Sequence, residues 1–237
     1  MMKYELQSLV VWAALASLLV ACVALPVDTN LPSGDMSLRT LQPCAPPCWY
    51  NIVPGRSTGD DVKRILPTLP FINPQSIEER HLEGNRNYFR WRYTNPPETS
   101  GSILVQNNIV IMVEAEPGFK LELREVVDRF GSPDRVLPNN FVLPDGGYYA
   151  VLIYYPNKGL AFATPRLPHL GYSAEEYSIE PTFPINTVYY LEPITLEQLI
   201  IYVHEIRPEQ VESVLERTYP WQGFGTFPFR LQPTPTP

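Results

Sequence analysis

Residues 44–69 read CAPPCWYNIVPGRSTGDDVKRILPTL, and this stretch predicts how the folded part of the chain begins. Ser57 or Thr58 can cap a helix, because an acidic residue follows three positions later and completes a capping box. Pro67 disfavours helical backbone at the residue before it, so we expect the regular helix to end there. Four apolar residues recur at the spacing of one helix face, namely Val62, Ile65, Leu66 and Leu69, and the last of them lies beyond Pro67.

Strand-like segments follow this helix, and the same order returns further along the chain. The first group of predicted strands comprises residues 77–81, 88–94, 103–106 and 109–114. A second helix is predicted by the spacing of Leu123, Val126, Val127 and Phe130, and strands follow at residues 148–155, 160–164 and 187–191. Further amphipathic segments start at Thr195 and Pro208. The pattern predicts an α+β fold: two repeats of a helix followed by an antiparallel β-meander, with a helical C-terminal addition.

Two short motifs carry a resemblance to known proteins. They are Pro54-Gly55-Arg56-Ser57, which precedes Val62 and Leu66, and the run Val126-Val127-Asp128-Arg129-Phe130-Gly131-Ser132-Pro133. Together they resemble the pattern of bacterial envelope lipoproteins of the SmpA/OmlA outer-membrane-assembly type and, in doubled form, the β-lactamase inhibitory protein. The layout is also similar to uncharacterised bacterial lipoproteins with Pro-Cys-Trp near the mature start. The resemblance implies a helix-on-sheet module that contacts proteins and does not catalyse a reaction; it transfers no binding residue.

The N-terminus predicts export and lipidation. Lys3 precedes an apolar run of signal-peptide length, and Leu19-Val20-Ala21-Cys22 matches the lipoprotein box whose cysteine receives the lipid. We expect a cleaved signal peptide and an extracytoplasmic chain attached to the bacterial membrane through the lipid on Cys22. The alternative is an uncleaved membrane helix, because the apolar run extends to Leu25.

The net charge of −7 and the absence of a Lys/Arg cluster in the sequence argue against nucleic-acid binding, because such binding relies on basic side chains that neutralise phosphates.

Residues 22–43 are rich in proline and predict a tether. Once Cys22 is lipidated, Cys44 and Cys48 are the remaining cysteines, and such a close pair outside the cytoplasm predicts a disulfide. Two thiols without a nearby histidine do not make a zinc site.

Residues with catalytic or metal-binding chemistry are few. Glu79, His81 and Glu83 share one face of a predicted strand and could hold a divalent metal, although exposed surface charge explains them as well. The sequence lacks the motifs of serine hydrolases, zinc proteases and phosphate-binding loops. We therefore predict no enzyme activity, no cofactor and no bound metal.

The tyrosines are better candidates for functional residues than the few side chains with catalytic or metal-binding chemistry. Tyr148, Tyr149, Tyr154 and Tyr155 lie in one predicted strand, where neighbouring rings point to opposite faces of the sheet. Rings outside the core would suit a protein or glycan surface, so these four are candidate ligand-binding residues. The alternative is that the C-terminal helices cover the second face and bury them.

These inferences divide the chain into six parts: a signal peptide at 1–21, a tether at 22–43, a first repeat at 44–117, a second repeat at 118–192, a helical addition at 193–230 and a disordered Pro-Thr tail at 231–237. The expected function is a protein-binding or assembly role in the cell envelope, with an envelope protein as partner. A glycan- or solute-binding lipoprotein is the alternative, and a hydrolase is the third hypothesis.

Overall fold

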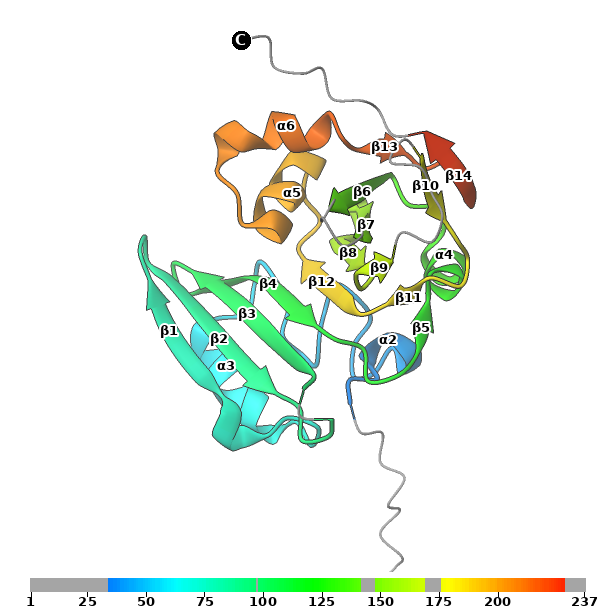
Figure 1. The fold of residues 1–237 in the computed structure, drawn as a ribbon. Coiled ribbons are helices and arrows are strands. Elements are labelled where there is room, and N and C mark those ends of the chain that lie inside the picture. Colours follow the sequence, from blue (N-terminus) through cyan, green and yellow to red (C-terminus); the bar gives the residue numbers. More distant parts are fainter. Residues whose placement is uncertain (1–33, 97, 142–147, 169–175, 229–237) are drawn as a thin grey trace, which may run out of the picture. The chain divides into compact units, whose positions relative to one another are not determined.

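A large antiparallel sheet forms the centre of the computed structural model, which describes residues 34–96, 98–141, 148–168 and 176–228 (Figure 1). The sheet has ten strands, and together with a few short helices it confirms the predicted α+β class. Nine of them lie in the order β1 (Glu78–Leu82), β2 (Arg86–Arg92), β3 (Ser100–Gln106), β4 (Ile109–Ala115), β12 (Thr187–Leu191), β8 (Leu160–Ala163), β7 (Tyr148–Tyr155), β6 (Arg135–Phe141) and β13 (Tyr219–Pro220), while β9 (Leu167–Pro168) pairs with β7.

Strand β12 joins the two parts of this sheet. It pairs antiparallel with β4 on one side and with β8 on the other, so that Tyr190 lies opposite both Val113 and Leu160. Strands β1 to β4 are neighbours both in the chain and in the sheet, whereas β12 comes from much later in the sequence. The ladder of β12 therefore connects segments that no local hairpin could bring together.

Helix α3 (Gly59–Ile65) begins and ends where its sequence predicts. The Thr58 hydroxyl accepts a hydrogen bond from the backbone of Asp61, whose carboxylate accepts one from the Thr58 backbone. That bond and the Arg64 side chain lower the pKa of Asp61 to about 2. After Ile65 the chain tightens into the 3₁₀ turn η1 (Leu66–Thr68), which contains Pro67.

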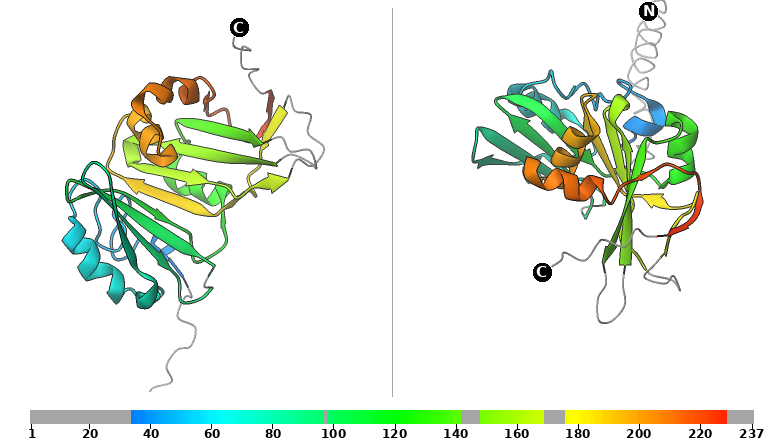
Figure 2. Two further views of the ribbon diagram at one scale, coloured as in Figure 1. Left: turned by 60° about the vertical axis from the view of Figure 1, so that its left-hand side comes forward. Right: turned by 90° about the horizontal axis from the view of Figure 1, so that it is seen from above.

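The other helices lie on opposite faces of the sheet (Figure 2). Helices α2 (Ser37–Thr40) and α4 (Leu123–Phe130) contribute to the same core as α3. Helices α5 (Leu196–His204) and α6 (Val211–Leu215) pack on the other face. Short 3₁₀ turns and two small two-stranded sheets complete the described part: η2 (Pro74–Ser76), η3 (Pro156–Lys158), η4 (Pro208–Gln210), β5 (Leu121–Glu122) with β11 (Pro184–Ile185), and β10 (Glu176–Ile179) with β14 (Gly225–Pro228).

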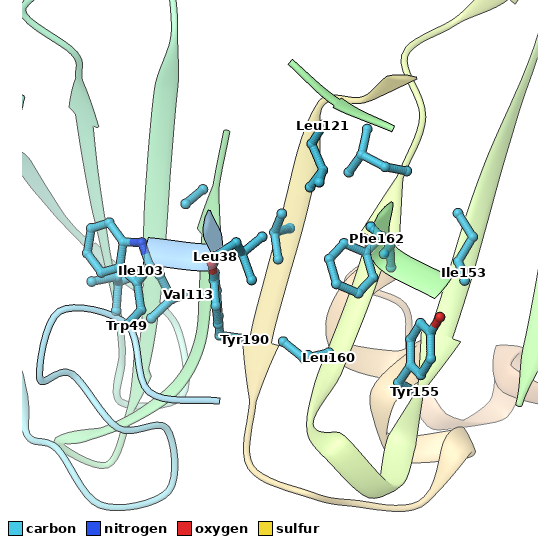
Figure 3. Close-up of a cluster of buried hydrophobic side chains, with 14 of the residues drawn as sticks. Leu38, Trp49, Ile103, Val113, Leu121, Ile153, Tyr155, Leu160, Phe162 and Tyr190 are labelled. Atoms are coloured by element: carbon cyan, nitrogen blue, oxygen red, sulfur yellow. The ribbon is translucent and has the colours of Figure 1, made fainter. Parts of the chain in front are cut away.

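Neighbouring residues of β12 serve two separate cores. Tyr190 is fully buried in the larger cluster, where Figure 3 shows it together with Val113, Leu160 and Trp49. Leu191 points to the other face and is buried in the cluster formed under α5 and α6. Because side chains alternate between the faces of a strand, one short strand holds both layers of the protein together.

The C-terminal part of the segment expected to be a tether, from Asp35 to Pro43, belongs to the described fold. Asp35 is 3% exposed, Leu38 of α2 is buried in the larger core, and Asp35 forms a bridge with Pro117. Proline and glycine near this segment favour a linker from composition alone. Tertiary contacts with Trp49 and Pro117 override that preference.

Two further differences concern strands. The helical addition expected at 193–230 contains α5 and α6, but from Tyr219 the chain continues as β13 and β14. Strand β6 was not predicted, because it contains Pro138, which lacks a backbone donor. Pro138 is tolerated because the outer neighbour β13 pairs only with Val136 and Arg135.

Cys44 and Cys48 form the disulfide expected from their spacing, with their Cα atoms 5.8 Å apart. Cys22, the expected signal peptide at 1–21 and the expected Pro-Thr tail at 231–237 lie outside the described residues. Among the helices that the structure describes, none combines the length and apolar character needed to cross a membrane.

The N-terminal segment crosses the chain near Gly118 at very short range. A Cβ atom added to Gly118 would overlap backbone atoms of Gly34 and Asp35. We expect Gly118→Ala to lower the free energy of unfolding by about 1–3 kcal/mol, because the two backbones must separate. Urea denaturation measures this loss. The control is Gly59→Ala, where the added Cβ meets side-chain atoms of Asn108 and Val105; an equal loss in both variants would contradict the prediction.

Candidate functional site

The uncovered side of β1 to β3 is the candidate site, and the alternation of β2 defines it. Phe89 and Trp91 point into the core, whereas Tyr88, Arg90 and Arg92 at the alternate positions point the other way. Pairing of β2 with β1 and β3 places side chains of the three strands in rows on that side. We call this surface the open face; its residues are Glu78, Arg80, Leu82, Arg86, Tyr88, Arg90, Arg92, Ser100, Ser102, Leu104 and Gln106.

Helices cover only part of this side of the sheet. Leu199 and Ile200 of α5 pack in one cluster with Leu104 of β3 and Met112 of β4. Among the described residues, this cluster includes none from β1, whose five residues are all exposed. The open face is thus bounded by α5 on one side and by the edge strand β1 on the other.

Arginines surround a hollow at one end of the open face. This hollow has a volume of about 570 Å³ and is lined by Ser76, Glu78, Arg80, Arg90, Trp91, Arg92, Glu98 and Ser100. The Arg80 guanidinium forms an ion pair with Glu78 at 3.0 Å, and Arg90 lies over the Tyr88 ring at 5.9 Å. Among the ion pairs of the described residues, none involves Arg90 or Arg92. We call this space the arginine hollow.

A second hollow of about 460 Å³ lies where the open face meets α5. Leu82, which is 42% exposed, contributes an apolar side chain from β1, and α5 contributes Ile201 and Tyr202. The remaining lining residues are Glu83, Gly84, Arg86, Leu104, Gln106, Glu205 and Ile206. We call this space the α5 hollow, and it is the more apolar of the two.

A chain of hydrogen bonds crosses the open face between these hollows. The Tyr88 hydroxyl donates to Ser102 Oγ at 2.9 Å, and the Ser102 hydroxyl donates to Glu114 Oε2 at 2.9 Å. Burial raises the pKa of Glu114, and the negative charge of Glu205 adds to this effect. The Ser102 hydrogen bond and Arg90 act in the opposite direction. The middle of the face therefore contains a carboxyl group that gains a proton more easily than an exposed glutamate.

Asp35 is a second carboxyl group with a raised pKa, but it serves the fold. Its oxygens accept hydrogen bonds from the Ser37 backbone at 2.8 Å and from Trp49 Nε1 at 2.7 Å. Burial is the largest cause of its raised pKa. The group is enclosed by these partners and lines none of the described hollows, so it has no access to a ligand.

The tyrosines singled out in the sequence divide into two pairs. Tyr154 and Tyr155 are 0% and 1% exposed, so the expectation that they form a surface is wrong for this pair. The Tyr154 hydroxyl bonds His204 Nε2 at 2.7 Å on the α5 side, and the Tyr155 hydroxyl donates to the Gly131 carbonyl at 2.9 Å. The C-terminal helices cover Tyr154, as the alternative held, whereas Tyr155 is buried in the larger core against Phe130 and Phe162. The side chains of Tyr148 and Tyr149 lie outside the described part.

The three residues considered for a metal site do not converge in the structure. His81 Nδ1 bonds Asn87 Oδ1 at 2.9 Å, and Asn87 also donates to Glu79 at 3.1 Å. Glu79 forms an ion pair with Lys63, and Glu83 lies beyond the end of β1. The described residues contain no group of three His, Cys, Asp or Glu side chains placed to hold a metal ion.

The cluster of arginines on the open face could not be predicted from the sequence, because these residues are not consecutive. Arg90 and Arg92 alternate with buried aromatic residues, which does signal a strand with one polar face. Arg80 joins them only through the pairing of β1 with β2.

No family model, curated protein or solved structure matches the chain. The functional conclusion therefore depends on the site itself.

Glu114 provides a test of the electrostatics of the open face. Because the pKa of Glu114 is raised in the folded protein, folding favours the protonated carboxyl. The resulting contribution to the free energy of unfolding is complete below the pKa of the unfolded chain, near 4.5, and is lost as the pH rises through the raised pKa. We expect Glu114→Gln to increase the free energy of unfolding at pH 7 and to reduce its dependence on pH. Urea denaturation from pH 4 to pH 8 measures both changes.

The control for this experiment is Glu212→Gln, an exposed glutamate of α6. It should behave as the wild-type protein does. A Glu114→Gln variant that is less stable at pH 7, or that keeps the wild-type pH dependence, would show that the charged form is favoured in the fold.

Proposed function

We propose that this chain is a lipid-anchored, extracytoplasmic protein-binding module of the bacterial cell envelope. The proposal combines the N-terminal lipoprotein box at Cys22 with the open face of β1 to β3. A surface of exposed arginines suits a protein interface, because guanidinium groups bind carboxylates through two parallel hydrogen bonds and stack on aromatic rings.

We further propose that the fold consists of two helix-plus-meander repeats. The connectivity supports this: α3 is followed by β1, β2, β3 and β4, and α4 is followed by β6, β7, β8 and β12. The last strand of each set, β4 or β12, pairs with the last strand of the other. This arrangement agrees with the resemblance to SmpA/OmlA-type lipoproteins and to the β-lactamase inhibitory protein, and with a role in protein contacts.

The single observation on which the function depends is the arginine hollow in an acidic chain. The chain has a net charge of −7, yet Arg80, Arg90 and Arg92 converge on one hollow from two strands. Locally positive surface in a negative protein steers binding towards an acidic site on a partner and away from general adhesion to anions. The glycan alternative relied on exposed tyrosines, and the burial of Tyr154 and Tyr155 removes two of its four candidates.

Crosslinking in the native cells tests the proposal. We expect the wild-type chain to yield one dominant envelope protein by mass spectrometry, and the Arg90→Glu/Arg92→Glu variant to lose it. The matched control is Arg56→Glu, an exposed arginine that lines neither hollow. Retention of the partner by the double variant, or equal loss in Arg56→Glu, would refute the role of the open face.

The anchor has its own test in the same cells. Cys22→Ser removes the thiol that receives the lipid, so we expect the chain to move from the membrane fraction to the soluble fraction. Fractionation followed by immunoblotting measures this shift. A variant that stays in the membrane fraction would favour the uncleaved helix over the lipid.

A further inference from the structure

The two hollows lie at opposite ends of one strand, and this spacing limits what can bind. Arg86 of β2 lines the α5 hollow, while Arg90 and Arg92 of the same strand line the arginine hollow. Tyr88 lies between them and is partly buried. From Arg86 to Arg92 the strand advances by about 20 Å at roughly 3.3 Å per residue. A single ligand that uses both hollows must span this distance.

The hollows differ in chemistry as well as in position. At the arginine hollow, Glu78 is paired with Arg80, which leaves Arg90 and Arg92 facing Glu98. At the α5 hollow, Leu82, Ile201 and Ile206 offer apolar surface. Glu83 and Glu205 line that same hollow, and Arg86 donates from Nε to the Glu83 carbonyl at 3.1 Å. Carboxylates of a ligand are thus attracted at one end and repelled at the other.

We infer that the open face binds an extended acidic segment of a partner protein, with its carboxylates in the arginine hollow and an apolar anchor side chain in the α5 hollow. This inference rests on the proposed function and names the part of the partner that is bound. The two hollows set the distance between carboxylates and anchor. The glutamates at the α5 end set which end of the segment lies there.

The period of strand β2 matches that of an extended ligand. Arg90 and Arg92 are two residues apart on the same face of β2, about 6.6 Å along the strand. An extended ligand repeats its side chains on one side with the same period, so alternate acidic residues meet successive arginines. On a helix, the side chains that lie about 5–6 Å apart are three or four positions apart in sequence, so a helical ligand would need a different spacing of its acidic residues.

Synthetic peptides test the inference on the full chain purified in detergent. The probe is a fluorescent Ser/Thr peptide with two glutamates separated by one residue and a leucine four residues further on. Fluorescence anisotropy should show binding that weakens by about tenfold or more when both glutamates become lysine or the leucine becomes serine, and that weakens as salt is added. Equal binding of all three peptides would overturn the inference.

A charge exchange makes the test independent of folding defects. The Arg90→Glu/Arg92→Glu variant should prefer the lysine peptide over the glutamate peptide, reversing the wild-type order. Leu82→Ser should weaken the leucine peptide and leave the serine peptide unchanged. Arg56→Glu should bind as the wild type does. A double variant that still prefers the glutamate peptide, or that shows no preference, would overturn the placement of the carboxylates.

Peptide spacing separates the extended segment from a helix. Moving the two glutamates to helical spacing, with the leucine kept on the same helix face, should weaken binding; stronger binding would overturn the extended conformation. The outcome is distinct from that of crosslinking in cells. A partner lost specifically in the Arg90→Glu/Arg92→Glu variant, combined with peptides that do not bind, would preserve the proposed function and overturn the extended segment.

Discussion

The pairing of β12 with both β4 and β8 is the interaction on which the rest of the structure depends. Without β12, strands β1 to β4 and strands β6 to β8 would each end in an unpaired edge at the middle of the protein. Its ladder closes both edges, and Tyr190 and Leu191 place neighbouring side chains in the two cores. Exposed edges are a liability in sheet proteins, so one strand of five residues removes two such sites at once. The pairing is a long-range contact, because β12 lies far from β4 in sequence and a long loop must be closed to form it.

The position of the two C-terminal helices gives the sheet its asymmetry. One face is covered along its length by α2, α3 and α4. The other face is covered at the centre by α5 and α6, which bury Tyr154 and Leu191, while β1 and β2 remain uncovered. The polar residues at alternate positions of β2 are therefore compatible with water and available to a partner. The open face is uncovered because the helical addition is too short to cover the whole sheet.

The sequence predicted what depends on local periodicity, and less of what depends on distant contacts. Thr58, Asp61 and Pro67 marked the limits of α3, and the alternation of aromatic residues and arginines marked β2 with its two faces. Pro138 concealed β6, since a proline in a strand is acceptable only where its neighbour leaves room. Composition made residues 34–43 resemble a linker, although Asp35 has two buried hydrogen-bond partners. The paired tyrosines left their burial open, because it depends on the placement of α5 over Tyr154 and of α4 beside Tyr155. The arginine hollow needed the β1–β2 pairing, which brings Arg80 alongside residues ten positions away.

If the chain carries the proposed lipid on Cys22, the burial of Asp35 limits how far the open face can lie from the membrane. With a lipid on Cys22, the segment that links the membrane to the fold would end at Asp35, which is hydrogen-bonded to Trp49, and not at the disulfide of Cys44. A fully extended segment from Cys22 to Asp35 would span at most about 45 Å, whereas one from Cys22 to Cys44 would span about 75 Å. On the proposed anchor, the shorter reach would restrict the open face to partners whose acidic segments lie close to the same membrane. The buried carboxyl group of Asp35 would then limit the distance at which the molecule can act.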